Sequence, residues 1–263
     1  MKVKVISENE KKTRILMTET TPEEANAIRR TIISEVPVLA IEDVVVVNNS
    51  SAMYDEMIAL RLGLIPLKTD LKLLNLPEKC SCKGKGCNKC RVEYFLKEKG
   101  PKVVYSGDLK TETGFEPVFK DIPITKLMEG QEVNIKCIAV LGKGLEHTKW
   151  SPGLAVHSYV PVINVKKHTE KEAKECIKHC DCEAIKLEKG KIVVDNDKLI
   201  YSEIKDSCLD ACKNILDVKW DDTRIIMTIE PWGQIGAKTM FNEATKILKE
   251  NYEEFLKEIK KLN

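Results

Sequence analysis

The sequence predicts an α+β protein in which the two ends of the chain build one platform and two insertions of different character interrupt it. Three observations carry this prediction. The first and last segments each combine a strand pattern with an apolar-striped helix. From Val92 to Val165, short β-like runs alternate with Gly and Pro, which indicates a mostly-β insertion. From Lys166 to about Leu216, two Cys-x3-Cys segments flank a hairpin-like stretch, which indicates a second insertion.

A β-hairpin and a capped helix are predicted at the N-terminus. Two short apolar runs, at 3–6 and 15–17, are separated by a polar stretch. Thr21, Pro22 and Glu24 form a helix-start signature, because Pro suits the first helical position and Thr and Glu complete a capping box. The apolar residues that follow fall on one helical stripe, which predicts a buried face: Ala25, Ile28, Ile32 and Val36.

Further elements follow in chain order. Residues 41–48 predict a strand, and residues 49–63 predict a second helix that closes at Gly63. Residues 224–230 predict a strand, and a long amphipathic helix follows. Its apolar residues step by four and three along the chain, and this stripe is either ordinary core or a partner interface: Leu248, Tyr252, Phe255, Ile259 and Leu262.

Length and composition limit the function. The chain has 263 residues, 43% hydrophobic and 32% charged, as expected for a folded protein of one to three domains. With 43 basic and 41 acidic side chains, the formal charge is +2, so we expect no direct sequence-specific nucleic-acid binding. The charged N-terminus lacks a signal region, and the apolar runs are too short to cross a bilayer. We therefore expect a cytoplasmic protein without membrane contact.

Four of the ten cysteines, Cys80, Cys82, Cys87 and Cys90, lie in one loop among Lys, Gly, Ser and Asn. Four thiolates on a short Gly-containing loop can close around one tetrahedral ion, and zinc prefers such ligands. With four protein ligands, the predicted site is structural rather than catalytic. The alternatives are reduced surface cysteines, two disulfides, or an iron–sulfur cluster, although the common ferredoxin spacing differs from this one.

The second cysteine set resembles the runs of two-cluster ferredoxins, C-x2-C-x2-C-x3-C-P, in which the fourth Cys of each run ligates the other cluster. Cys176 and Cys180 occupy the last two places of one run, and Cys208 and Cys212 those of the other. The first two places of both runs lack Cys, so we expect a ferredoxin-like domain with degenerate cluster ligands and no iron–sulfur cluster. Cross-ligation would pair Cys176 with Cys212 and Cys180 with Cys208, as reduced core cysteines or as disulfides.

No credible catalytic set is found in the sequence. The four His residues form no H-E-x-x-H motif, and no G-x-S-x-G is present. Cys137, in a β-like run, is expected in the core. Trp150, next to Lys149, is either a cation–π or surface anchor or a packed residue at a strand end. His179 and Cys182 offer a further, weaker alternative for a metal site.

Three segments resemble a known family. Residues 23–67, EEANAIRRTIISEVPVLAIEDVVVVNNSSAMYDEMIALRLGLIPL, resemble the signature of the α-like subunits of DNA-dependent RNA polymerase. Residues 141–153, LGKGLEHTKWSPG, resemble a second signature of the archaeal and eukaryotic members. Residues 221–256 resemble the returning part of their dimerisation domain. With a ferredoxin-like insertion between them, these segments are most similar to the archaeal members, the D-type subunits.

The resemblance implies an organisation and a function. Residues 1–45 and 217–263 would form the dimerisation domain, 46–165 an inserted mostly-β domain with the zinc loop, and 166–216 the ferredoxin-like domain. Such subunits are not catalytic, although they belong to a nucleotidyltransferase complex. They pair with a smaller α-like subunit, L, and the pair binds subunits N and P and docks the second-largest subunit. The alternatives are a free ferredoxin-like iron–sulfur electron carrier and a zinc-stabilised nucleic-acid-binding module.

The same resemblance implies interface residues. The dimer interface would use the helix at 26–36, with Asn26 and Ile33, and the C-terminal helix, with Leu248, Tyr252, Phe255 and Ile259. Candidates for contact with the larger subunits are Arg29, Arg30, the helix at 54–63, and the 146–150 signature with His147 and Trp150. The alternative for each is an intradomain salt bridge or core packing.

Overall fold

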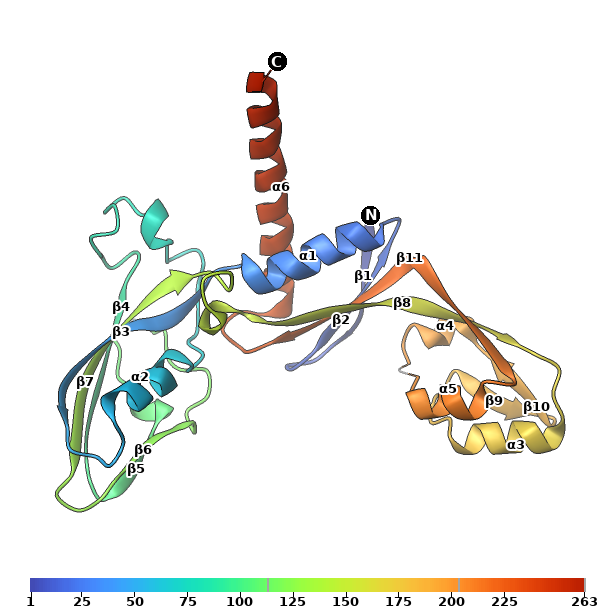
Figure 1. Cartoon of the computed structure of the whole chain (residues 1–263), viewed down its shortest axis with the longest axis horizontal. Coiled ribbons are helices and arrows are strands. Elements are labelled where there is room, and N and C mark those ends of the chain that lie inside the picture. Colours follow the sequence, from blue (N-terminus) through green and yellow to red (C-terminus); the bar gives the residue numbers. More distant parts are fainter. Residues whose placement is uncertain (113, 203, 263) are drawn as a thin grey trace. The chain divides into compact units, whose positions relative to one another are not determined.

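The computed structural model describes residues 1–112, 114–202 and 204–262, and Figure 1 labels its elements. The chain divides into two compact units. Unit 1 comprises Met1–Arg29 and Ala155–Ile229, and unit 2 comprises Arg30–Leu154 and Glu230–Asn263. Helices and sheets both contribute to the fold, so the α+β prediction is confirmed. The predicted boundaries of the three domains stay a prediction.

A four-stranded sheet in the order β1-β2-β11-β8 forms the framework of unit 1. β1 (Lys2–Glu8) and β2 (Thr13–Thr18) are the predicted hairpin, and β11 (Leu216–Pro231) contains the predicted strand at 224–230. The fourth strand is β8 (Gly153–Val165). The sequence placed this strand at the end of the mostly-β insertion, whereas its hydrogen-bonded neighbour is β11.

The first helix, α1 (Pro22–Ser34), begins at the predicted signature. The Glu24 amide donates to Thr21 Oγ1 at 3.3 Å, and the Thr21 amide donates to Glu24 Oε2 at 3.2 Å, so the capping box is confirmed. The four residues of the predicted stripe are all buried. Arg29 Nε and Nη2 donate to Asn26 Oδ1 at 3.1 and 3.0 Å, which makes a local pair one helical turn apart.

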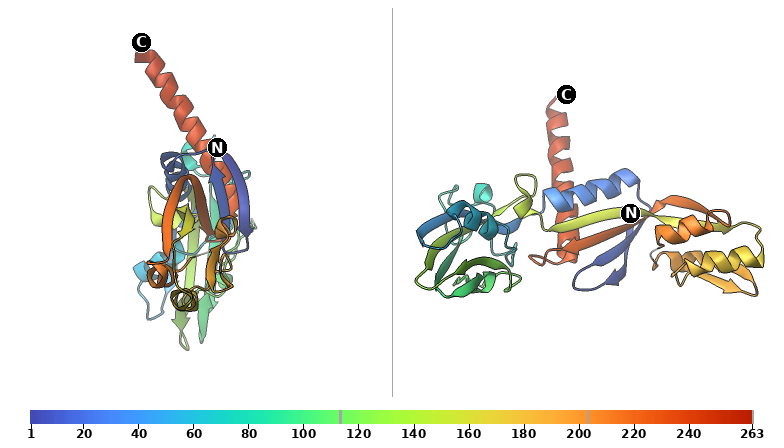
Figure 2. Two further views of the ribbon diagram at one scale, coloured as in Figure 1. Left: turned by 90° about the vertical axis from the view of Figure 1, so that its right-hand side faces the viewer. Right: turned by 60° about the horizontal axis from the view of Figure 1, so that its bottom comes forward.

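Residues 163–216 hold a hydrophobic core of their own. α3 (Glu170–Lys178) and α5 (Asp206–Cys212) lie side by side in both views of the ribbon (Figure 1, Figure 2). The predicted hairpin is formed by β9 (Ile185–Glu188) and β10 (Lys191–Val194), followed by the short helix α4 (Asn196–Leu199). α5 contributes Cys208 and Cys212 to this core, whereas α3 contributes Cys176 alone, since Cys180 lies two residues beyond its end and is partly buried.

Two small antiparallel sheets build the mostly-β part of unit 2. One has the order β3-β7-β4, with β3 (Val38–Asn49), β7 (Glu132–Gly142) and β4 (Val92–Lys99). The other pairs β5 (Lys102–Tyr105) with β6 (Pro123–Leu127), a strand that the sequence did not predict. Alternate residues of β4 and β7 face the core, which includes Tyr94, Leu96, Ile135 and Cys137.

The second helix, α2 (Asp55–Gly63), begins at Asp55 and not at residue 49, so its predicted start is wrong. The cause is a side-chain turn at Asn49. Its Oδ1 accepts from the Ser51 amide at 3.0 Å, and its Nδ2 donates to the Met53 carbonyl at 2.8 Å. These bonds satisfy backbone groups that a helix would otherwise use. The helix ends at Gly63 as predicted.

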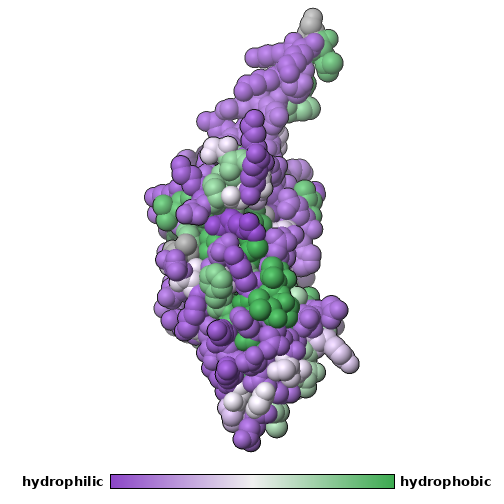
Figure 3. All heavy atoms as spheres, turned by 90° about the vertical axis from the view of Figure 1, so that its left-hand side faces the viewer, coloured by the Kyte–Doolittle hydropathy of each residue, from purple (hydrophilic) through white to green (hydrophobic). Residues whose placement is uncertain are grey.

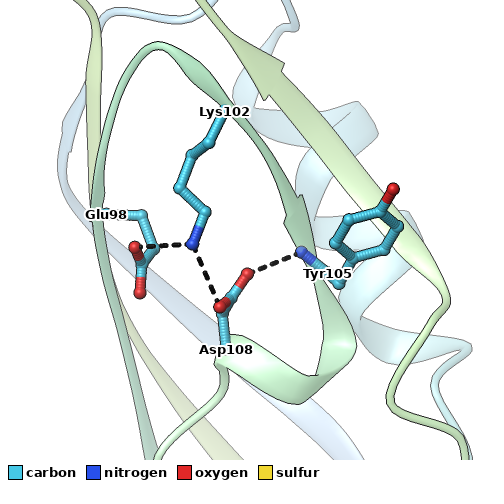
Figure 4. A network of polar contacts seen from close by, with 4 residues as sticks. All are labelled: Glu98, Lys102, Tyr105 and Asp108. Atoms are coloured by element: carbon cyan, nitrogen blue, oxygen red, sulfur yellow. Dashed lines mark hydrogen bonds and ion pairs between the residues drawn. The ribbon is translucent and has the colours of Figure 1, made fainter.

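A polar network in unit 2 ties β5 to its neighbours (Figure 4). Lys102 Nζ donates to Glu98 at 2.9 Å and to Asp108 at 3.1 Å, and the Tyr105 amide donates to the other Asp108 oxygen at 2.8 Å. The contacts cap the single turn η2 (Ser106–Asp108). Hydrogen bonds to Glu98, and then to Asp108, raise the pKa of Lys102.

The chain ends in the predicted long helix, α6 (Ala237–Leu262). Its first turns are buried through Ala237, Met240, Phe241 and Ala244. Beyond Leu248, which is half-buried, every described residue of the helix is exposed. No helix in the described part of the chain is long and apolar enough to cross a membrane.

Candidate functional site

The predicted zinc loop folds into a knuckle, defined here as residues 77–91, which begins with the turn η1 (Pro77–Lys79) and ends just before β4. The Lys83 amide donates to the Cys80 carbonyl at 2.9 Å, and the Lys85 amide donates to the Cys82 carbonyl at 3.2 Å. Gly84 adopts a φ of +79°, a conformation that glycine permits at little cost. These turns bring the four cysteines of the loop to one point.

The four Sγ atoms of the knuckle lie within 4.8 Å of one another. The separations are 3.6 Å for Cys80–Cys87, 3.5 Å for Cys82–Cys90 and 3.9 Å for Cys87–Cys90. In a tetrahedral zinc site with bonds of about 2.3 Å, the sulfurs lie about 3.8 Å apart. The separations are also far longer than a disulfide bond of about 2.05 Å. The four thiols therefore fit one tetrahedral metal ion such as zinc.

The thiols of the knuckle influence one another's ionisation. Burial raises the pKa of Cys82, but hydrogen bonds from Cys90, Cys80, the Gly86 amide and Cys87 outweigh burial and lower it to about 6. Burial raises the pKa of Cys90 to about 12. Cys82 thus ionises readily, whereas Cys90 keeps its proton until a cation takes its place, as happens when a metal binds a cysteine cluster.

The second cysteine set lies in the core of residues 163–216. Disulfides join Cys176 to Cys212 and Cys180 to Cys208, which are the pairs that cross-ligation indicated. Each bond consumes two thiolates, so this arrangement leaves none of the four to ligate an iron–sulfur cluster. Cys182 is buried in the same core, and His179 is exposed. In the described part of the chain, neither belongs to a group of side chains that could hold a metal ion.

The far half of α6 carries the predicted apolar stripe. Tyr252 and Phe255 are each 61% exposed, and Ile259 and Leu262 are exposed too. Leu256 is exposed beside them. It was not predicted as part of the stripe, although its spacing of four residues from Tyr252 places both on the same face of a helix. At the top of Figure 3, the end of α6 is hydrophilic over most of the face in view, and hydrophobic residues show along one edge. An exposed stripe of this size on a helix is typical of an interaction surface.

The other predicted interface residues differ in exposure. Arg30 and His147 are exposed, whereas Asn26, Arg29 and Ile33 are half-buried. Their contact with a partner stays a prediction. The single turn η3 (Thr148–Trp150) begins at His147, whose Nδ1 accepts from the Lys149 amide at 3.0 Å.

Trp150 combines both alternatives that the sequence left open. It is only 6% exposed, and its Nε1 donates to the Val140 carbonyl at 3.2 Å. Lys149 Nζ lies 4.4 Å from the centre of its ring, and the same ammonium contacts the carboxylate of Glu42. Trp150 is therefore packed at the strand end and also engaged in a cation–π contact.

Comparisons with known proteins cover nearly the whole chain. Residues 44–162 match the model of the RNA polymerase Rpb3/RpoA insert domain. The DNA-directed RNA polymerase subunit Rpo3 of Pyrobaculum calidifontis is 40% identical over 238 residues, which is 89% of this chain and 87% of the relative. The Rpo3 subunits of Methanothermobacter thermautotrophicus and Methanopyrus kandleri are 38% and 36% identical over 237 and 254 residues. These two matches cover 88% and 94% of this chain, and 88% and 90% of the relatives. The chain therefore belongs to the family of the DNA-directed RNA polymerase subunit Rpo3.

Proposed function

We propose that this chain is a D-type α-like assembly subunit, and that it pairs through α6 with the smaller α-like subunit L. Membership of the Rpo3 family makes it an assembly subunit of DNA-directed RNA polymerase, and so a part of a nucleotidyltransferase complex. The alternative of a free iron–sulfur electron carrier has no support, since relatives and fold both point to the polymerase. The finer statement, the pairing, rests on one observation, the exposed apolar stripe of α6.

The stripe is suited to a helical partner. Side chains of the size of Tyr252, Phe255 and Leu256 each gain about 1.5–3 kcal/mol when fully buried, so a partner that covers them binds favourably. The rest of this half of α6 is charged, with eight Lys and Glu residues from Lys249 to Lys261: Lys249, Glu250, Glu253, Glu254, Lys257, Glu258, Lys260 and Lys261. A helix of this kind lays its apolar face against an apolar surface of another chain.

Other parts of the chain would complete the platform. Arg30, His147 and the exposed Met57 and Leu60 of α2 are available for the second-largest subunit and for subunits N and P. One structural zinc ion in the knuckle would hold its loop. We expect such a complex to act in the cytoplasm.

Co-expression with a subunit L homologue tests the pairing. Phe255→Asp places a carboxylate in the stripe and should weaken pairing at least about a hundredfold, as expected for a buried aromatic anchor. Lys257→Asp is the matched control, because it introduces the same side chain on a charged face of the same helix. If the unaltered chain never co-elutes with subunit L, or if both variants pair equally well, the proposed interface is wrong.

A further inference from the structure

The knuckle carries positive charge that its own fold leaves unneutralised. Residues 78–91 contain one carboxylate, Glu78, and five cations: Lys79, Lys83, Lys85, Lys89 and Arg91. Across 1–112, 114–202 and 204–262, no carboxylate lies within 4.0 Å of any of these five cations. A zinc ion with four thiolates would add two negative charges, so the metal-loaded knuckle stays cationic.

A cavity of about 170 Å³ lies beside the knuckle, within unit 2. The knuckle lines it with Lys85, Arg91, the two glycines on either side of Lys85, Pro77 and the metal-site residue Cys90. The sheet lines it with Ile138 and Val140 of β7 and with Asp43 of β3. The cavity thus combines two cations, an apolar floor and a single carboxylate.

Arg91 has an unmet hydrogen bond at this place. Its Nε is buried and donates to no acceptor in the part of the chain that the structure describes. A Cβ on Gly86 would lie 3.2 Å from Arg91 Nη1, so the missing side chain leaves room for the guanidinium against the loop. A buried donor without an acceptor is unfavourable, and a shift of the guanidinium toward an acceptor bound in the cavity would relieve this cost.

We propose that this cavity binds a carboxylate from an acidic segment of another polymerase subunit, an assignment of partner that rests on the proposed function. The planar guanidinium of Arg91 suits a carboxylate, which can accept two parallel hydrogen bonds from it. Lys85 supplies the second charge. The three other lysines of the knuckle lie outside the cavity and attract an acidic segment from a distance.

An acidic peptide fits better than a nucleic acid. The cations are confined to one loop in a chain whose net charge is only +2, whereas nucleic-acid binding needs a continuous basic surface. Residues 77–91 contain no aromatic side chain on which a base could stack.

Binding of a labelled hexaglutamate peptide to the zinc-loaded full chain, measured by fluorescence anisotropy at low salt, tests the proposal. Lys85→Gln with Arg91→Gln removes the two cations of the cavity and should weaken binding about tenfold or more. Lys79→Gln with Lys89→Gln removes the same charge from the same knuckle outside the cavity. This control should lose only about two- to threefold, since exposed charges are screened. An equal loss in both variants would overturn the cavity in favour of diffuse attraction.

Two further measurements keep the outcome decisive. Zinc content is determined for each variant. If a glutamine variant loses its metal, Arg91→Lys takes its place, because it keeps the positive charge but cannot form two parallel hydrogen bonds with a carboxylate. This variant should bind the peptide several-fold more weakly than the unaltered chain. Tighter binding of a deoxythymidine oligonucleotide, lost in the same cavity variant, would overturn the proposal in favour of a nucleic acid. So would displacement of the peptide by inorganic phosphate but not by acetate. Co-elution of every variant with subunit L separates a failure of this site from a failure of the proposed function.

Discussion

Breaking both disulfides of the 163–216 core should unfold that segment under conditions in which the sheets of unit 2 stay folded. The bond between Cys176 and Cys212 spans 36 residues of sequence, and the bond between Cys180 and Cys208 spans 28. In the chain-entropy account, the first closure contributes about 4 kcal/mol. The second adds about 2.5 kcal/mol. It contributes less because, once the first bond is formed, the second closes only a short loop, with about four residues between the bonds on each side. The sum, about 6 kcal/mol, equals the whole stability of many small domains.

Little else in this segment can compensate. Its buried residues include no aromatic side chain. Besides the three fully buried bonded cysteines, three of its buried positions hold only the small side chains of Ala173, Ala184 and Cys182. A core of some fifty residues buries a small share of its surface and depends on cross-links more than a larger domain does. Loss of the bonds is therefore expected to be decisive for α3 and α5.

Hydrogen exchange with mass-spectrometric detection measures this directly. Replacing all four bonded cysteines by Ala should speed exchange in α3 and α5 by up to about four orders of magnitude, while β7 amides keep their protection. Cys137→Ala is the matched control, since it removes a buried cysteine without a bond and should affect only the sheet of unit 2. Unchanged protection in α3 and α5 would refute the reasoning. So would alkylation that finds these four thiols free in the unaltered chain.

Three other predictions concern unit 2. Cys82→Ser should lower the zinc content of the purified chain from one ion to much less than one, measured with a chromogenic chelator, because three thiolates hold the ion less tightly. Gly142→Ala should destabilise the chain by about 1–3 kcal/mol in denaturant unfolding, since its Cβ would lie 2.4 Å from the Trp150 ring; Gly63→Ala, where the nearest atom is 3.6 Å away, should be neutral or stabilising. Lys102→Met should cost about 1 kcal/mol or less at pH 8. Because the folded pKa of Lys102 is raised, its contribution is complete below about pH 10 and fades as pH rises further, so the difference between variant and unaltered chain should shrink there.

Local signals explain what the sequence predicted well. The capping box of Thr21 and Glu24 and the hairpin at 185–194 depend on residues within a few positions of one another, and both are confirmed. The pairing of β8 with β11 joins strands separated by the whole second insertion, and no local pattern encodes it. The late start of α2 was decided by Asn49, whose side chain offers the backbone an alternative that helical periodicity does not reveal.

The same distinction holds at the candidate site. The four ligands of the knuckle are close in sequence, so their spacing alone indicated a tetrahedral centre that the sulfur separations fit. The cavity beside them was not predictable in this way. Its walls come from β3 and β7, which lie some forty residues before and after the knuckle, and the unmet donor of Arg91 depends on where its guanidinium packs.

The two cysteine sets differ because their surroundings differ. In the knuckle, hydrogen bonds from Cys90, Cys80, the Gly86 amide and Cys87 lower the pKa of Cys82, which favours the thiolate that a metal needs. The sulfurs of the second set lie in a core of apolar side chains, where a thiolate is unfavourable and a neutral bond is not. Two centres built from the same element should therefore respond to different reagents. A chelator should loosen the knuckle and leave α3 and α5 protected, and a reductant should loosen α3 and α5 while zinc stays bound.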